Sequence, residues 1–176
     1  MNIGISGAQC TGKTSLIDAL HKSGYNVYTL VARTVMKQHP INKNGNDGTQ
    51  RAIIDTHLRN LDNSTGVSFM DRCLVDGMVF TLYGARQGKV SAATLADIYK
   101  DFYQNINRYD YIVYLEPEFP IISDGVRDED EDFRQELCQL YELVLSTVPV
   151  PIIRPKGTVH ERAQTILNAT GLFGDR

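Results

Sequence analysis

The feature that most constrains this chain is an eight-residue motif, G-x-x-x-x-G-K-T, at positions 7–14. Its two glycines allow a tight loop whose successive backbone N–H groups can point at the oxygens of a polyphosphate. Lys13 can bridge the β- and γ-phosphates, and the hydroxyl of Thr14 can ligate Mg2+. The motif therefore predicts a nucleoside triphosphate site built by the following residues: Gly7, Ala8, Gln9, Cys10, Thr11, Gly12, Lys13, Thr14 and Ser15.

The residues on either side of this motif fit the strand-loop-helix context that a phosphate loop needs. Ile3 and Ile5 alternate with smaller residues, as in a short strand. Residues 15–21 have the periodicity of an amphipathic helix, which Gly24 can end. The positive N-terminal end of that helix would add to the attraction for an anion. This context favours a phosphate loop over a glycine-rich turn that matches the pattern by chance.

Length and composition favour a single α/β domain that spans residues 1–176, with 42% hydrophobic residues for its core. The net charge of −3 and the lack of a Lys or Arg block argue against a nucleic-acid partner and against a basic membrane surface. No segment resembles a secretory signal or a membrane span, so we expect a cytoplasmic protein. The sequence leaves open whether it is a monomer or a homodimer.

The three cysteines, Cys10, Cys73 and Cys138, are widely spaced and form no C-x-x-C pair. We therefore expect reduced thiols and no zinc site. Cys10 lies inside the phosphate loop, where it is expected to act as a small filler. The alternative is that its oxidation regulates nucleotide binding.

Strand-like and helix-like segments alternate along the chain, which predicts a parallel sheet with helices on both faces. We expect five strands, at residues 2–6, 26–30, 67–70, 111–115 and 150–153. Helical periodicity appears in seven segments between and after them: residues 14–23, 30–38, 49–62, 75–87, 92–107, 130–147 and 158–169.

In an open α/β sheet, ligands bind beyond the carboxyl ends of the strands. Asp71 and Arg72 directly follow the expected third strand. An aspartate there can hold Mg2+ directly or through water, and an arginine can form a fork with an acceptor phosphate. The alternative is that Asp71 is only a helix N-cap and Arg72 only a surface arginine.

Three further arginines follow other expected strands. Arg33 begins a helix after the second strand, where it could reach an anionic acceptor. Arg127 and Arg134 lie in an acidic segment at about 120–135, which we interpret as a lid that closes over the triphosphate and excludes water. The alternative for this segment is a solvated helix start, because the helix dipole favours acidic residues in the first turn of a helix.

The turn after the fifth strand, at residues 154–158, precedes the last helix. Thr158 and Glu161 have the spacing of a capping box, which predicts a helix start at this point. The same turn could pass close to the donor base.

With these residues assembled, the chain resembles the P-loop nucleoside and nucleotide kinases. The group in question includes the ribosylnicotinamide kinase domain of the bacterial NAD-biosynthesis regulator and phage (deoxy)nucleotide kinases. Four motifs carry the resemblance across nearly the whole chain: residues 5–15, Val31-Ala32-Arg33, Asp71-Arg72 with Asp76 and Tyr83, and residues 124–127 with Arg134.

This resemblance implies a nucleoside-monophosphate-kinase-like fold with a five-stranded parallel sheet and an arginine-bearing lid. It also implies ATP as the donor, used with Mg2+ that Thr14 and Asp71 would organise. The catalytic candidates are Lys13, Asp71, Arg72, Arg127 and Arg134. The candidates for binding a small-molecule nucleotide acceptor are Arg33, Arg72 and Asp76.

One departure from related chains bears on the acceptor. They commonly carry a glutamate just before the Val-Ala-Arg stretch, where it could take a proton from an acceptor hydroxyl, and here that position is Leu30. A phosphate monoester needs no such base, because it is already a nucleophile at pH 7. We therefore expect phosphoryl transfer to a (deoxy)nucleoside monophosphate, with thymidylate as one candidate.

Two alternatives remain at this point. The first is a nucleoside or ribosylnicotinamide kinase, in which Asp71 acts as the base toward a hydroxyl acceptor. The second is a regulatory P-loop ATPase that hydrolyses ATP slowly and signals to a partner protein. The chain lacks the Asn-Lys-x-Asp motif by which many switch proteins bind guanine, which disfavours the second alternative.

Overall fold

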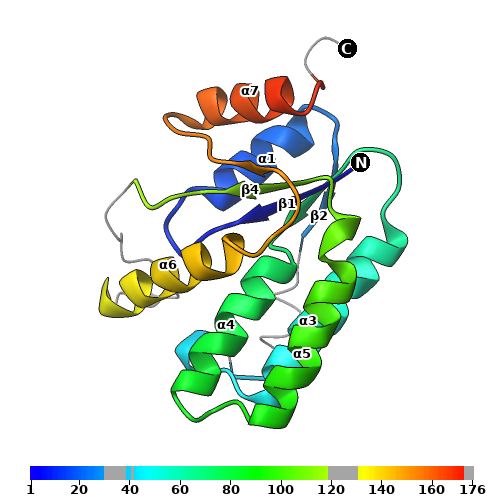
Figure 1. The fold of residues 1–176 in the computed structure, drawn as a ribbon. Helices are drawn as coiled ribbons and strands as arrows, with labels where there is room; N and C mark the ends of the chain where they lie inside the picture. Colours follow the sequence, from blue (N-terminus) through cyan, green and yellow to red (C-terminus); the bar gives the residue numbers. More distant parts are fainter. Residues whose placement is uncertain (30–38, 41, 119–130, 173–176) are drawn as a thin grey trace.

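The computed structural model describes residues 1–29, 39–40, 42–118 and 131–172, which form a parallel sheet flanked by helices (Figure 1). The strands are β1 (Asn2–Ser6), β2 (Asn26–Tyr28), β3 (Ser68–Asp71), β4 (Tyr111–Tyr114) and β5 (Ile152–Ile153). The α-helices are α1 (Lys13–Lys22), α3 (Asp47–Asn63), α4 (Leu74–Arg86), α5 (Ala92–Asn105), α6 (Glu131–Leu145) and α7 (Val159–Ala169). Two short 3-10 helices complete the described elements: η1 (Asn42–Asn44) and η2 (Ile106–Arg108).

The five strands are all parallel and lie in the order β2-β3-β1-β4-β5. The chain starts in the central strand, and its neighbours β3 and β4 come from much later in the sequence. Ile5 of β1 pairs with Asp71 on one side and with Val113 on the other. The end of β1, where the phosphate loop begins, therefore lies between the ends of β3 and β4, as expected for a ligand site in this kind of sheet.

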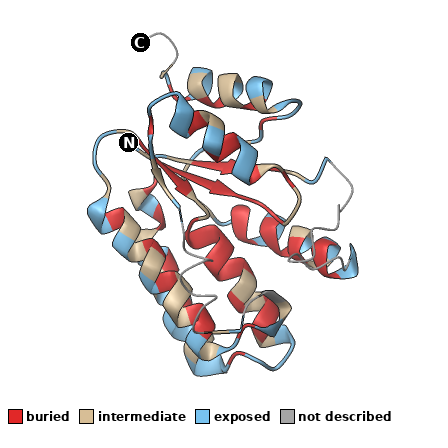
Figure 2. Cartoon of the chain, turned by 180° about the vertical axis from the view of Figure 1, so that it is seen from behind, coloured by how far each residue is buried: buried red, intermediate tan, exposed pale blue. Residues whose placement is uncertain are grey.

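Helices cover both faces of the sheet, which confirms the predicted fold class. Helices α1 and α7 pack on one face, and the other α-helices of the described residues, α3, α4, α5 and α6, lie on the opposite face (Figure 1). Each face has its own apolar core, and the central strands β1, β3 and β4 between them are almost entirely buried (Figure 2). Successive side chains of a strand point to opposite faces, so Ile3 and Ile5 enter the α1/α7 core while Met70 enters the other.

The observed boundaries differ from the expected ones at several elements. Strand β3 includes Asp71, so this residue ends the strand instead of following it. Strand β5 spans two residues only, since Pro151 cannot donate a hydrogen bond to a neighbouring strand. The helix expected at 92–107 ends at Asn105 and tightens into η2. The helix expected at 30–38 lies outside the described residues.

The capping box predicted for the last helix is confirmed. Thr158 Oγ1 accepts a hydrogen bond from the backbone N–H of Glu161 at 3.3 Å. Glu161 Oε2 in turn accepts one from the N–H of Thr158 at 2.7 Å. These two bonds satisfy donors that a helix start leaves without partners, so local sequence alone sets the beginning of α7.

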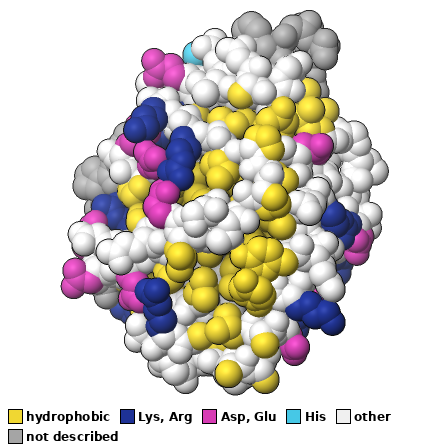
Figure 3. Space-filling model, viewed as in Figure 1, with side chains coloured by type: hydrophobic (Ala, Val, Ile, Leu, Met, Phe, Trp, Pro, Cys, Tyr) yellow, Lys and Arg dark blue, Asp and Glu magenta, His cyan; other side chains and the backbone are white. Residues whose placement is uncertain are grey.

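Hydrophobic side chains gather over the middle of one face of the molecule, while Lys and Arg lie in small groups with acidic neighbours (Figure 3). Across the described residues, the large hydrophobic side chains that are exposed are Met1, Tyr99, Tyr103 and Leu143. None of the helices in the described ranges is long and apolar enough to span a membrane. Within the same ranges, His, Cys, Asp and Glu form no group of three or more that could hold a metal ion by themselves.

Candidate active site

The phosphate loop connects β1 to α1 and lies against the end of β4. Gly7 has φ 143° and Gly12 has φ 83°, values that side chains of L-residues rarely allow. A Cβ on Gly7 would lie 2.5 Å from the carbonyl oxygen of Leu115. The loop can therefore approach β4 this closely only because residue 7 has no side chain.

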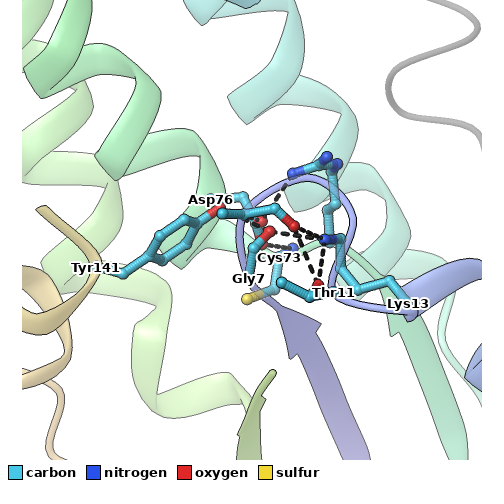
Figure 4. Close-up of polar contacts among 8 residues, drawn as sticks. Gly7, Thr11, Lys13, Cys73, Asp76 and Tyr141 are labelled. Atoms are coloured by element: carbon cyan, nitrogen blue, oxygen red, sulfur yellow. Dashed lines mark hydrogen bonds and ion pairs between the residues drawn. The ribbon is translucent and has the colours of Figure 1, made fainter. Parts of the chain in front are cut away.

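Lys13 is buried within the loop, although it carries a charge. Its Nζ donates hydrogen bonds to the carbonyl oxygen of Gly7 at 2.7 Å, to Thr11 Oγ1 at 3.0 Å and to the carbonyl oxygen of Ala8. Figure 4 shows this ammonium within the curve of the loop. The loop thus holds a positive charge at the place where its backbone would receive phosphate oxygens.

The two candidate Mg2+ ligands lie at the same edge of the sheet. Thr14 is exposed in the first turn of α1, directly after the phosphate loop. Asp71 is half-buried at the end of β3 and pairs in register with Ile5, two residues before Gly7. Mg2+ prefers oxygen ligands and usually combines one or two protein groups with water and substrate phosphates. A hydroxyl and a carboxylate at the phosphate loop fit that requirement.

The structure rules out the alternative that Asp71 is a helix cap. The N-cap residue of α4 is Cys73, whose N–H donates to Asp76 Oδ2 at 3.0 Å. Asp76 therefore has the capping role that the alternative gave to Asp71. As a result, the carboxylate of Asp71 is not needed to begin α4.

Arg72 adopts an unusual backbone conformation, with φ 70°. This left-handed region is unfavourable for a residue with a side chain, and such strain is often found at functional sites. The N–H of Arg72 donates to the carbonyl oxygen of Ile5 at 2.9 Å, which holds this turn against β1. The side chain is 26% exposed, so solutes can reach part of the guanidinium.

Asp76 connects Arg72 to the phosphate loop through the hydroxyl of Tyr141. This aspartate is 2% exposed, and its Oδ1 accepts from Arg72 Nη1 at 3.0 Å and from the hydroxyl of Tyr141 at 2.8 Å. The Tyr141 hydroxyl also lies 3.2 Å from the carbonyl oxygen of Gly7 (Figure 4). One buried carboxylate of α4 thus joins the turn after β3 to α6, and Tyr141 extends this connection to the loop. The predicted contact of Asp76 with an acceptor stays a prediction.

Burial and charge set the ionisation of this cluster. Burial disfavours the charged form of Arg72, but the negative charge of Asp76, with a smaller contribution from Asp71, outweighs it and raises the pKa above its usual value. Burial raises the pKa of Tyr141 well above its usual value, and Asp76 adds to this shift. Arg72 is therefore cationic and Tyr141 is a neutral hydrogen-bond donor across the physiological range.

The acceptor candidate Arg33 and the predicted lid arginines have different outcomes. Arg33 and Arg127 lie outside the described residues, as does most of the lid segment at 120–135. Arg134 is in α6, 9% exposed, and its Nη2 and Nε donate to Glu131 Oε1 at 2.8 and 3.2 Å. It lines a surface pocket of about 360 Å3 with other residues of α6 and with Pro117. The role of Arg134 in catalysis stays a prediction.

Sequence reasoning missed several buried polar side chains. Tyr141 lies at this site, and Gln50 and His57 are on the buried face of α3. Within the described part of the chain, neither ring nitrogen of His57 nor Oε1 of Gln50 has a hydrogen-bond partner. Only their position on the apolar stripes of helices could have indicated burial, because no short motif contains them.

Several solved structures share this fold. NadR protein in complex with NR aligns with a TM-score of 0.78 and 19% identity over 99% of this chain and 53% of that chain. Deoxyadenosine kinase from M. mycoides, with products dCMP and dCDP bound, aligns with a TM-score of 0.68 and 18% identity over 97% of this chain and 98% of that one. YorR protein from Bacillus subtilis, in complex with phosphorylated GDP, gives a TM-score of 0.59 and 17% identity over 98% and 96%.

These neighbours belong to the group that the sequence motifs resemble, so the resemblance is confirmed at the level of the fold. A search of curated proteins found no match. A family model described as an AAA domain matches residues 2–162, which include the phosphate loop, all five strands and the Asp71–Asp76 turn. The chain therefore belongs to this AAA domain family of P-loop proteins.

Proposed function

We propose that the protein is a kinase that uses ATP and Mg2+ to phosphorylate a (deoxy)nucleoside monophosphate, with thymidylate as one candidate acceptor. One observation carries this proposal: the cationic, partly exposed Arg72 is held by a buried aspartate at the sheet edge next to the phosphate loop. A second fixed positive charge beside a triphosphate site is suited to a second phosphate group.

The donor side follows from the phosphate loop. Backbone N–H groups and Lys13 would bind the β- and γ-phosphates, as in other loops of this sequence. Thr14 and Asp71 would hold Mg2+, which neutralises charge on the transferring group. Lys13 can turn from the loop carbonyls to phosphate oxygens, because its ammonium lies within the loop itself.

On the acceptor side, Arg72 would bind the phosphate group of the monophosphate. Among the described residues, its side chain hydrogen-bonds to Asp76 through Nη1. A guanidinium has five N–H donors, so this anchor leaves a fork for a phosphate. Arg33 would add a second cation, and Leu30 supplies no carboxylate for a hydroxyl acceptor.

In the proposed reaction, an oxygen of the acceptor phosphate attacks the γ-phosphorus of ATP. A new P–O bond forms, the bond to the β–γ bridging oxygen breaks, and ADP leaves. Such transfers depend mostly on positioning and charge stabilisation. Arg127 and Arg134 would stabilise the charge on the transferring group from the lid.

A hydroxyl acceptor is the second candidate, because Cys73 and not Asp71 is the N-cap residue of α4, and a carboxylate at the end of β3 could act as a base. Two of the similar structures are described as a deoxyadenosine kinase and as NadR with NR, which is in line with this candidate. In this case Asp71 would take the proton of the hydroxyl as it attacks the γ-phosphorus.

The deciding experiment is a coupled assay of ADP release with ATP and Mg2+. The panel of acceptors contains ribo- and deoxynucleoside monophosphates, free nucleosides and ribosylnicotinamide. A Lys13→Ala protein purified in parallel reports contaminating kinases. Strong stimulation by one monophosphate supports the proposal and names the acceptor. Stimulation by an uncharged nucleoside alone supports the second candidate, and slow hydrolysis unaffected by any acceptor would favour a regulatory ATPase.

A further inference from the structure

Arg162 of α7 contacts the phosphate loop from the side of the sheet opposite to Arg72. It is 2% exposed, and its Nη1 donates a 2.6 Å hydrogen bond to the carbonyl oxygen of Thr11. The same nitrogen lies 3.2 Å from where a Cβ on Gly12 would be. The guanidinium therefore packs directly against the Thr11–Gly12 peptide, and helix α7 lies along α1 (Figure 1).

The other end of the guanidinium connects to the segment after β4. Nη2 lies 3.2 Å from Glu118 Oε1, and Glu118 Oε2 accepts from the N–H of Gly157 at 3.2 Å. Arg162 and Glu118 thus join three segments: the phosphate loop, the residues after β4, and the turn before α7. The carboxylate also compensates the cost of burying a cation.

The contact with Thr11 orients the next amide. The described residues contain no cis peptide bond, and in a trans peptide the C=O and the following N–H point in opposite directions. Because the Thr11 carbonyl points at Arg162 in α7, the N–H of Gly12 points away from α7. This is one of the amides by which a loop of this sequence binds phosphate oxygens.

The charge of Arg162 is hard to explain by stability alone. Gly12 is the N-cap residue of α1, so the guanidinium lies at the positive end of that helix dipole. A cation there is unfavourable for the helix itself. A triphosphate in the loop reverses this effect, because it is attracted by the dipole and by the buried cation together.

We propose that Arg162 is a positioning residue for the donor triphosphate, which orients the Thr11–Gly12 peptide and is in turn held by Glu118. This proposal rests on the donor half of the proposed function and is independent of the acceptor. Arg162 acts on the phosphates through the backbone of the loop.

The test compares Arg162→Met, Arg162→Lys and Glu118→Gln by the affinity for inorganic tripolyphosphate, measured by competition with a fluorescent ATP analogue. Tripolyphosphate contains no base or sugar, so it reports on the loop and not on the turn near residue 157. We expect Arg162→Met to lose about tenfold in affinity, since a charge-assisted hydrogen bond and a nearby charge are both removed. Arg162→Lys should recover part of this loss, and Glu118→Gln should show a smaller one.

Arg108→Met is the matched control, because it removes an ion pair, with Asp62 at 2.7 Å, that does not involve the phosphate loop. Its tripolyphosphate affinity should equal that of the wild type. Thermal unfolding without nucleotide reports stability separately. If a folded Arg162→Lys and a folded Glu118→Gln both bind tripolyphosphate like the wild type, Arg162 is only structural and the proposal is wrong. A kinase assay that finds no acceptor leaves this binding test valid, so the two proposals fail separately.

Discussion

Tyr141 and Asp76 are 65 residues apart in the sequence and share a buried 2.8 Å hydrogen bond. The tyrosine belongs to α6 and the aspartate to α4, and Asp76 also holds Arg72. Hydrogen bonds to an ionised group are stronger than neutral ones, and the buried position adds to their importance. The bond therefore couples the α6 side of the site to the candidate acceptor arginine.

Tyr141→Phe should destabilise the protein by about 1–3 kcal/mol, because Asp76 loses a donor in a buried position. It should also raise the KM of the acceptor, since Arg72 is anchored through the same carboxylate. Urea unfolding and steady-state kinetics measure the two effects. The control is Tyr103→Phe, which removes an exposed hydroxyl bonded to Thr147. Equal effects of both variants would show that the buried bond has no special role.

Lys13→Ala should lower turnover by about two orders of magnitude or more, because a cation that stabilises the transferring phosphate is lost. The fold should remain, since the core on both sides of the sheet is unchanged. Single-turnover ADP formation and circular dichroism measure these outcomes. Lys22→Ala, at the exposed end of α1, should behave like the wild type. A Lys13→Ala protein with near-normal transfer would contradict the assignment of the donor site.

Arg72→Ala and Arg72→Gly should both raise the KM of the acceptor far more than that of ATP, because both remove the guanidinium. Their stabilities should differ. Glycine tolerates the φ of 70°, so Arg72→Gly should be more stable than Arg72→Ala by about 1 kcal/mol. Kinetics and urea unfolding of the pair separate the side chain from the backbone. Equal changes in both KM values would place Arg72 on the donor side.

His57 should make folding stability depend on pH. Burial lowers its pKa from 6.5 to about 4, with Asp76 acting against this shift and Arg72 adding to it. Above pH 6.5 the ring is neutral in both states. Between pH 6.5 and 4 only the unfolded chain takes up the proton, so stability falls as the pH drops, by about 3 kcal/mol in total.

The measurement is urea unfolding of the wild type and of His57→Leu at several pH values between 7 and 4.5. The part of the pH dependence that His57 causes should be absent in the variant. His160→Gln, which changes an exposed histidine on α7, should keep the wild-type dependence. If His57→Leu keeps it as well, the ring is not buried in its neutral form.

Asp71→Asn distinguishes the two acceptor classes. If Asp71 is mainly a Mg2+ ligand, the loss of activity should be partly recovered at high Mg2+, because an amide oxygen binds the ion more weakly than a carboxylate. If Asp71 is the base for a hydroxyl acceptor, activity should be abolished even at saturating Mg2+. A Mg2+ titration of both proteins, with the best acceptor of the panel, decides between these outcomes.

Much of this site could be predicted because it depends on neighbours in the sequence. The phosphate loop needs two glycines at fixed spacing, and the α7 cap needs Thr158 three residues before Glu161. Asp71 and Arg72 could be placed at a sheet edge, since a parallel sheet brings the ends of its strands together. The alternation of short apolar segments with helical ones predicted five parallel strands, and this was confirmed.

Other features depend on contacts between distant segments, which no local pattern encodes. Tyr141 and Arg162 look like ordinary residues of amphipathic helices, and they reach the loop only because α6 and α7 pack on opposite faces of the sheet. The alternative interpretation made Asp71 the cap of α4, but the cap is Cys73, because β3 continues through Asp71 along β1. Local hydrogen-bonding rules therefore determine the motif, and packing across the sheet determines which buried side chains hold it in place.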